Sequence, residues 1–89
     1  MMGEKMNNLC IAIFTNRTHT LSFYAKLRSF GIVSKIRNMP KGLGSSCGLV
    51  VEFPFRDLQR AKALIMQMRL SSFKHIYLNN SNFEYKLIV

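Results

Sequence analysis

The chain has 89 residues and a mass of 10.3 kDa, a size typical of one domain and too small for a cleft between two domains. Hydrophobic residues make up 48% of it, which excludes a disordered chain and predicts a packed core. Thirteen Lys and Arg against four Asp and Glu give a formal charge of +9. Acidic partners, such as nucleic acid, a membrane surface or an acidic protein, therefore have to be considered.

Cysteine usage and the N-terminal residues bear on the cellular compartment. Cys10 and Cys47 stand far apart and form no CxxC pair, and neither the two Cys nor the two His have metal-ligand spacing. The first eight residues lack the apolar stretch of a signal peptide. The run Leu9–Phe14 is far shorter than the roughly 20 residues that span a bilayer. We expect a cytoplasmic protein with no membrane segment and no metal.

The first half of the chain predicts a strand, a helix and a second strand. Leu9–Phe14 is short and apolar, as in a buried strand. A helix is expected at about 19–30, with Thr18 or Thr20 as its N-cap and Gly31 as its C-terminal stop. Ile32–Arg37 is half apolar, which is typical of an edge strand.

The second half predicts a similar set of elements after a loop at 38–46, where one Pro and two Gly interrupt regular structure. The expected elements are a central strand at Cys47–Phe53, a helix at Leu58–Met68 and a strand at Phe73–Leu78. The turn at Asn79–Asn82 allows a hairpin with Phe83–Val89.

This order predicts the α+β class and a ferredoxin-like βαββαβ fold, an antiparallel sheet with two helices on one face. A single domain is expected over residues 1–89, with a core of about 9–78. Residues 79–89 then form a C-terminal β extension.

The predicted topology gives Cys47 a distinctive place. The first and third strands are adjacent and antiparallel in this fold, so Cys47 is expected near the start of the first helix. The helix N-terminus, Arg17 and His19 would then lower its pKa below the usual value of about 8.5 and favour the thiolate. Ser45, Ser46 and Gly48 would add hydrogen-bond donors around it.

A simpler interpretation is that Cys47 is a small apolar residue at the first position of a strand. Alternation along that strand turns Glu52 to solvent and Leu49, Val51 and Phe53 toward the helices, and Cys47 shares their parity. Cys10 lies near the other end of the first strand, and we interpret it as structural.

The segment from Met39-Pro40 through Ser45-Ser46-Cys47-Gly48 to Phe53, preceded by Thr18-His19 at a helix start, resembles the bacterial selenium/sulfur carrier-like protein family. The resemblance covers about Leu9 to Tyr77. It implies a carrier rather than an enzyme. The stretch Thr15-Asn16-Arg17, the basic balance and the tail after Leu78 depart from the family pattern and bear on the partner more than on the fold.

In such a carrier, Cys47 would accept sulfur or selenium as a persulfide or selenosulfide, without another cofactor. Ser45, Ser46, Gly48 and Thr18 would form its binding shell, and Arg17 and His19 would tune the thiolate. The implied partner is a sulfur or selenium donor or acceptor protein, such as a cysteine desulfurase.

An RNA-binding module is the second hypothesis, because Cys47–Phe53 is superficially similar to the third-strand signature of the RNA-recognition motif. The positions that stack bases there hold Gly48 and Val50 instead of aromatic residues. Phe14 and Tyr77 remain candidate stacking surfaces. Candidate phosphate contacts are Lys35, Arg37, Lys41, Arg56, Arg60 and Lys62.

An interaction or dimerisation domain is the third hypothesis, and it needs no cysteine chemistry. Cys10, Ala12, Phe14 and Val50 are expected to make the open face of the sheet apolar. An exposed apolar face is a candidate surface for a homodimer or another partner.

Overall fold

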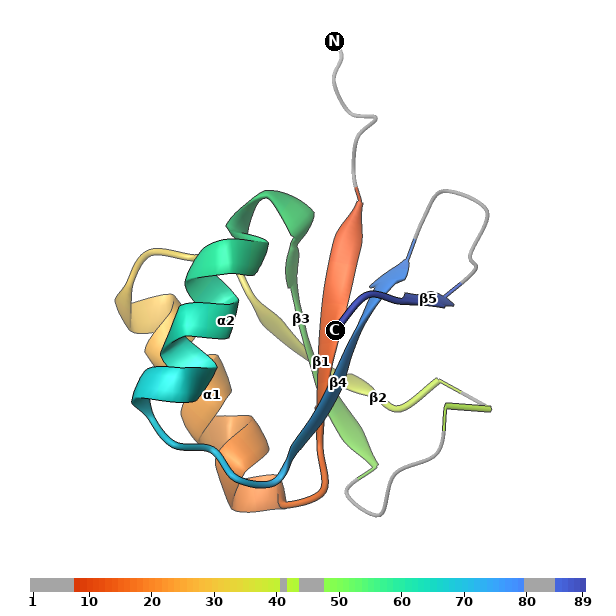
Figure 1. Cartoon of the computed structure of the whole chain (residues 1–89), viewed down its shortest axis with the longest axis horizontal. Helices are drawn as coiled ribbons and strands as arrows, with labels where there is room; N and C mark the ends of the chain where they lie inside the picture. The colour runs from red at the N-terminus through yellow and green to blue at the C-terminus, as the bar shows by residue number, and fades with distance from the viewer. Residues whose placement is uncertain (1–7, 41, 44–47, 80–84) are drawn as a thin grey trace, which may run out of the picture.

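The computed structural model describes residues 8–40, 42–43, 48–79 and 85–89. One sheet forms a layer, and both helices cover the same side of it (Figure 1). The elements in chain order are β1 (Leu9–Phe14), α1 (Arg17–Ser29), β2 (Lys35–Asn38), β3 (Leu49–Pro54), a 3₁₀ turn (Phe55–Asp57), α2 (Leu58–Gln67), β4 (Phe73–Asn79) and β5 (Tyr85–Leu87).

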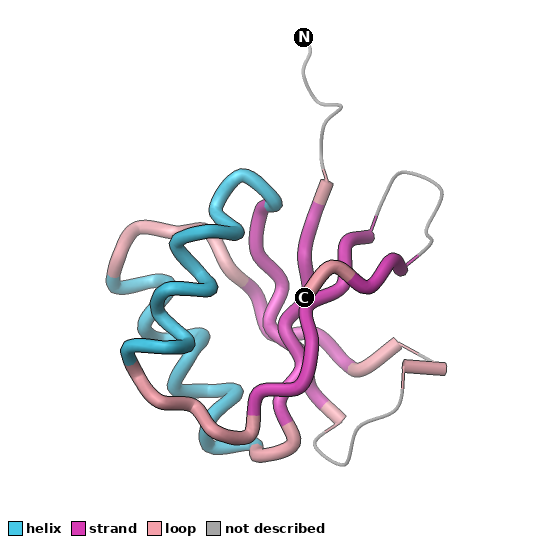
Figure 2. The backbone as a smooth tube through the Cα atoms, in the orientation of Figure 1, coloured by secondary structure: helices cyan, strands magenta, loops and turns pink. Residues whose placement is uncertain are grey.

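The strands follow the order β2-β3-β1-β4-β5, and every neighbouring pair is antiparallel. This confirms the α+β class and the antiparallel sheet with two helices. The sheet has five strands, however, and so it is not an exact ferredoxin-like βαββαβ unit. The fifth is added because the chain after β4 returns and pairs with it, from Tyr77 opposite Leu87 to Asn79 opposite Tyr85 (Figure 2).

The first helix begins two residues earlier than predicted. Asn16 is its N-cap, since the Asn16 side chain accepts the backbone N–H of His19 at 3.0 Å. Thr18 and Thr20 are therefore not caps, and the buried Thr20 hydroxyl instead donates to the Asn16 carbonyl. Gly31 ends the helix as predicted, with a left-handed φ of 77°.

The second and third strands in chain order, β2 and β3, begin later than predicted. Ile32 donates its N–H back to the Leu27 carbonyl at 3.0 Å, so it closes the last turn of α1, and β2 begins only at Lys35. The strand β3 begins at Leu49, after Gly48, and the predicted start at Cys47 lies outside the described part of the chain.

The main core lies between the sheet and the helices. Val51 and Phe53 face the helices, as predicted. The prediction that Cys10, Ala12 and Phe14 face the open side was wrong, since these residues are fully buried in the same core. The cross-strand register gives the reason: Cys10 lies opposite Phe53 and Ala12 opposite Val51, and directly opposed residues share a face.

A smaller apolar cluster covers the opposite face of the sheet. It consists of Ile11, Ile13 and Val50, none of which is more than 3% exposed. The side chains of Met39, Leu43 and Tyr77 pack against them. The centre of this face is therefore already covered by the chain itself.

Residues that follow β5 complete the core on the helix side. Ile88 and Val89 pack against it, and Ile76 and Val89 exchange backbone hydrogen bonds at 3.3 Å. The described residues of the 79–89 extension are thus an integral part of the sheet.

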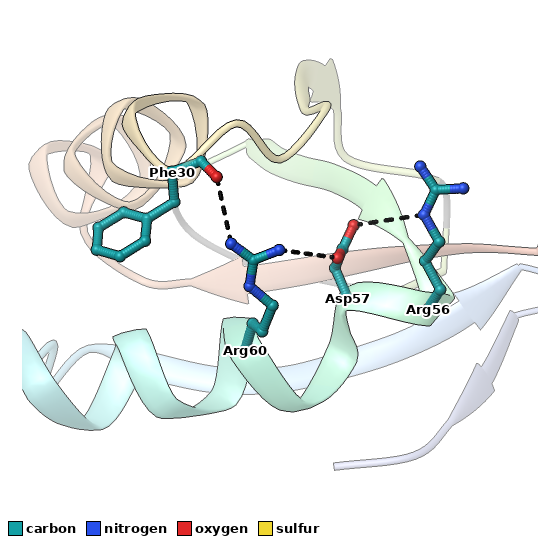
Figure 3. A network of polar contacts seen from close by, with 4 residues as sticks. All are labelled: Phe30, Arg56, Asp57 and Arg60. Atoms are coloured by element: carbon teal, nitrogen blue, oxygen red, sulfur yellow. Dashed lines mark hydrogen bonds and ion pairs between the residues drawn. The ribbon is translucent and has the colours of Figure 1, made fainter.

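A polar network joins the two helices (Figure 3). One guanidinium nitrogen of Arg60 in α2 donates to the Phe30 carbonyl at the end of α1, at 3.2 Å. A second guanidinium nitrogen of Arg60 lies 3.6 Å from one carboxylate oxygen of Asp57. The other carboxylate oxygen of Asp57 lies 3.9 Å from Nε of Arg56. A cation at a helix C-terminus satisfies unpaired carbonyls and interacts favourably with the helix dipole.

We expect Arg60→Ala to lower the free energy of unfolding by about 0.5–1 kcal/mol, a small loss because the side chain is half exposed to solvent. Urea unfolding followed by circular dichroism measures it. Arg56→Ala is the matched control, since the Arg56 side chain is 81% exposed and its contact is longer. Equal losses in the two variants would show that Arg60 does not cap α1.

Candidate functional site

The candidate site lies at the end of the sheet where β1 leads into α1 and where β3 and β4 begin (Figure 1). Thr15, after β1, donates its backbone N–H to the Ser72 carbonyl before β4 at 3.0 Å. On the other side of β1, the last paired residues are Ile13 and Val50. Gly48 lies two residues before Val50, at this same end.

Of the predicted site residues, Arg17, Thr18, His19 and Gly48 are described, whereas Ser45, Ser46 and Cys47 lie outside the described residues. The first three form the first turn of α1. Arg17 and Thr18 are exposed, and His19 is half-buried. The structure therefore places the predicted basic and polar groups at the helix start that the topology predicted.

The His19 ring is held by a residue that sequence analysis missed. Its Nδ1 lies 2.7 Å from the Ser72 hydroxyl. Ser72 lies just before β4, whose start meets the end of β1 because the two strands are antiparallel. That topological relation was the available signal for Ser72. The hydrogen bond fixes the orientation of the imidazole at the first turn of α1.

Gly48 is required by its backbone conformation. Its φ is 77°, a left-handed value that strains residues with a side chain, although a Cβ there would meet no heavy atom within 4 Å. Its carbonyl accepts the N–H of Met39 at 2.9 Å, which closes the ladder between β2 and β3. Gly48 is exposed, so the backbone at this end of β3 is open to an incoming group.

Cys10 lies in a very different environment. Its side chain is fully buried in the helix-side core, and this burial raises the pKa of its thiol to about 12. A thiol with such a pKa forms almost no thiolate at neutral pH. This environment supports the interpretation of Cys10 as structural.

Among the described residues, the centre of the open sheet face carries aliphatic side chains where an RNA-recognition motif has a stacking platform. The central strands present Ile11, Ile13 and Val50 there, all aliphatic and buried. Phe14 was wrongly predicted as a stacking surface, because it is fully buried on the helix side, 5.3 Å from Phe23 between ring centroids. Tyr77 is half-buried, with its ring 6.0 Å from that of His75.

The predicted phosphate contacts that the structure describes do not form one cluster of unpaired cations. Within the described residues, Arg37 pairs with Glu52, and Arg56 and Arg60 pair with Asp57. Lys41 lies outside the described part of the chain. The same part contains no group of three or more His, Cys, Asp or Glu arranged to hold a metal, and no helix long and apolar enough to cross a membrane.

The described geometry defines a small α+β domain in which a helix N-terminus, a fixed imidazole and an exposed glycine lie at the same end of the sheet. A family model described as "Putative Se/S carrier protein-like" matches residues 9–88, and the chain belongs to this family. Comparisons with curated proteins and with solved structures find no match.

Proposed function

We propose that the protein carries sulfur or selenium on Cys47, as a persulfide or selenosulfide, and delivers it to a partner. The observation that carries the proposal is the family match, which spans the Ser45-Ser46-Cys47-Gly48 motif. The family description names sulfur and selenium as the cargo. Cysteine is the residue type that binds either element covalently and reversibly.

The position of Cys10 supports this assignment. A carrier holds its cargo only if no second thiol lies near enough to expel it by forming a disulfide. Cys10 lies opposite Phe53, near the C-terminal end of β3. Gly48, the residue after Cys47, directly precedes the N-terminal end of the same strand. The buried Cys10 thiol is thus separated from the Gly48 end of the strand.

The transfer step needs no external oxidant or reductant. The Cys47 thiolate attacks the outer sulfur of a donor persulfide, and a new bond forms between Cys47 Sγ and that sulfur. The bond between the two donor sulfurs breaks, and the donor leaves as a thiolate that takes up a proton. Transfer to an acceptor thiolate reverses these events, so the carrier returns unchanged.

The described end of the sheet supplies groups that favour such a reaction. The N–H groups at the start of α1 and the exposed Arg17 stabilise negative charge nearby. His19, oriented by Ser72, adds a second basic group. In this proposal Arg17 and His19 tune the thiolate, and Thr18, Ser45, Ser46 and Gly48 form its shell.

The proposal also includes a ferredoxin-like fold and a cytoplasmic location. The order β2-β3-β1-β4 suits a ferredoxin-like βαββαβ unit, to which β5 adds one strand. A carrier that needs a reduced thiol suits the cytoplasm, where thiols are kept reduced.

We expect incubation with a cysteine desulfurase and cysteine to add the mass of one sulfur atom to the protein, at Cys47. Intact-protein mass spectrometry and peptide mapping without reductant measure this. Selenocysteine replaces cysteine in a parallel reaction to test selenium. Cys10→Ser should keep full loading, whereas Cys47→Ser should lose it. Loading that persists in Cys47→Ser, or that maps to Cys10, would disprove the proposal.

A further inference from the structure

The strand β2 forms one edge of the sheet, with no strand beyond it among the described residues. The hydrogen bond from Met39 N–H to the Gly48 carbonyl fixes which of its backbone groups face outward. In an antiparallel ladder, alternate residues direct both backbone groups to the same neighbour. Lys35 and Arg37, like Met39, therefore face β3, while the N–H and carbonyl groups of Ile36 and Asn38 face outward.

The side chains along this edge are basic. Lys35 and Arg37 lie two residues apart and so share one face of the strand. Both are exposed, and the acidic partner on β3 is Glu52, which lies 3.3 Å from Arg37. Two cations against one carboxylate leave an excess of positive charge on β2.

An apolar groove lies beside this basic face. It has a volume of about 200 Å³ and combines Leu9, Val33, Phe53 and Pro54 with Ser34 and the charged residues Lys35, Arg37 and Glu52. Val33 is 63% exposed. A groove of this size is below the range of about 300–1,000 Å³ usual for small-molecule sites, but it accommodates one apolar side chain. The Ser34 hydroxyl is buried and has no hydrogen-bond partner within the described residues.

We propose that β2 is a docking edge for an extended, acidic segment of a partner protein, which adds to the sheet as a further strand. Outward backbone groups supply the hydrogen bonds of such strand addition, and side-chain pockets supply specificity. Pairing with β2 of a second copy is disfavoured, because it would bring Lys35 and Arg37 against like charges on a protein of net charge +9.

The geometry defines the sequence of the segment. Residues opposite Arg37 and Lys35 are acidic, and the residue two positions further along, opposite Val33, is apolar and enters the groove. An antiparallel segment therefore reads acidic-x-acidic-x-apolar, and a parallel segment reads in reverse order. The excess charge on β2 makes the association weaken as salt is added.

The test uses two acetylated synthetic peptides, one for each direction, with Glu at the acidic positions, Thr between them and Leu at the apolar position. Titration into the ¹⁵N-labelled full chain at low salt should shift the amide signals of Ile36 and Asn38. Asn38→Pro should weaken binding at least about tenfold, because it removes an outward N–H but no bond to β3. Asn38→Ala, the matched control, should bind normally, and Lys35→Glu should bind more weakly.

Several results would overturn the proposal. These are no binding of either peptide at low salt, shifts confined to the other edge at β5, or equal binding by Asn38→Pro and Asn38→Ala when the spectra show both folded. The proposal would also be overturned if a short single-stranded RNA displaces the peptide and binds Asn38→Pro as tightly as the unmodified chain. The proposal is independent of the sulfur chemistry, because Cys47→Ser is expected to bind the peptide normally.

Discussion

Phe23→Ala is expected to lower the free energy of unfolding by about 3–5 kcal/mol, the range for removing a buried aromatic side chain. Phe23 projects from α1 onto the two central strands and is fully buried. Its ring lies 5.3 Å from that of Phe14 and 6.2 Å from that of Phe53, between centroids. An 89-residue domain has a total stability of roughly 4–13 kcal/mol, so this one substitution removes a large part of it.

Urea unfolding followed by circular dichroism measures the loss. Phe30→Ala is the matched control, because Phe30 is the same residue type but is 51% exposed just after the helix. We expect the control to lose less than about 1 kcal/mol. Similar losses for the two variants would mean that the three rings do not form the centre of the core.

Alkaline pH is expected to destabilise the protein through Cys10. Burial raises the pKa of this thiol from an ordinary value of 9.0 to about 12 in the folded state. Above about pH 9, the unfolded chain therefore loses the Cys10 proton while the folded chain keeps it. The contribution of the protonated Cys10 thiol to the free energy of unfolding is fully present below about pH 9. It is lost as the pH rises toward 12, by up to about 1.4 kcal/mol for each pH unit.

Comparison with Cys10→Ala isolates this effect, since Cys47, lysine and tyrosine titrate in both chains. The unmodified chain should be more stable at about pH 8, and its advantage should shrink by about pH 10.5. Urea unfolding at both pH values gives the difference. Iodoacetamide provides a second readout, because the native chain should react at one cysteine and the urea-unfolded chain at two. An advantage that stays constant with pH would contradict the raised pKa.

The element order was predictable because each element has a local signal. Alternation along β3 placed Val51 and Phe53 correctly, since the polar Glu52 marks the other face. No such marker exists in Leu9–Phe14, where every residue is apolar, and the facing of β1 was therefore predicted one residue out of phase. Only the cross-strand register with β3 settles it.

The site was less predictable because its key contacts join distant parts of the chain. Asn16, Thr18 and Thr20 are all acceptable N-caps by residue type, and the tertiary structure selects Asn16. The contact between His19 and Ser72 spans 53 residues and depends on where β4 begins. Sequence patterns identified Arg17, Thr18 and His19 as neighbours at a helix start and a strand from Phe73, but no local pattern indicated that the Ser72 hydroxyl would bond to the His19 ring.

The described residues on both sides of the Ser45-Ser46-Cys47 motif are held on the sheet, which bears on the proposed carrier function. Leu43 packs on the sheet, and the Gly48 carbonyl is bonded to Met39, so four residues separate two fixed points. Four residues reach at most about 14 Å, and neighbouring α carbons are about 3.8 Å apart. For the proposed carrier, a segment of this length is too short to serve as an arm that shuttles between two stationary enzymes. We therefore expect the donor and the acceptor to bind in turn at the same end of the sheet and to inhibit each other competitively.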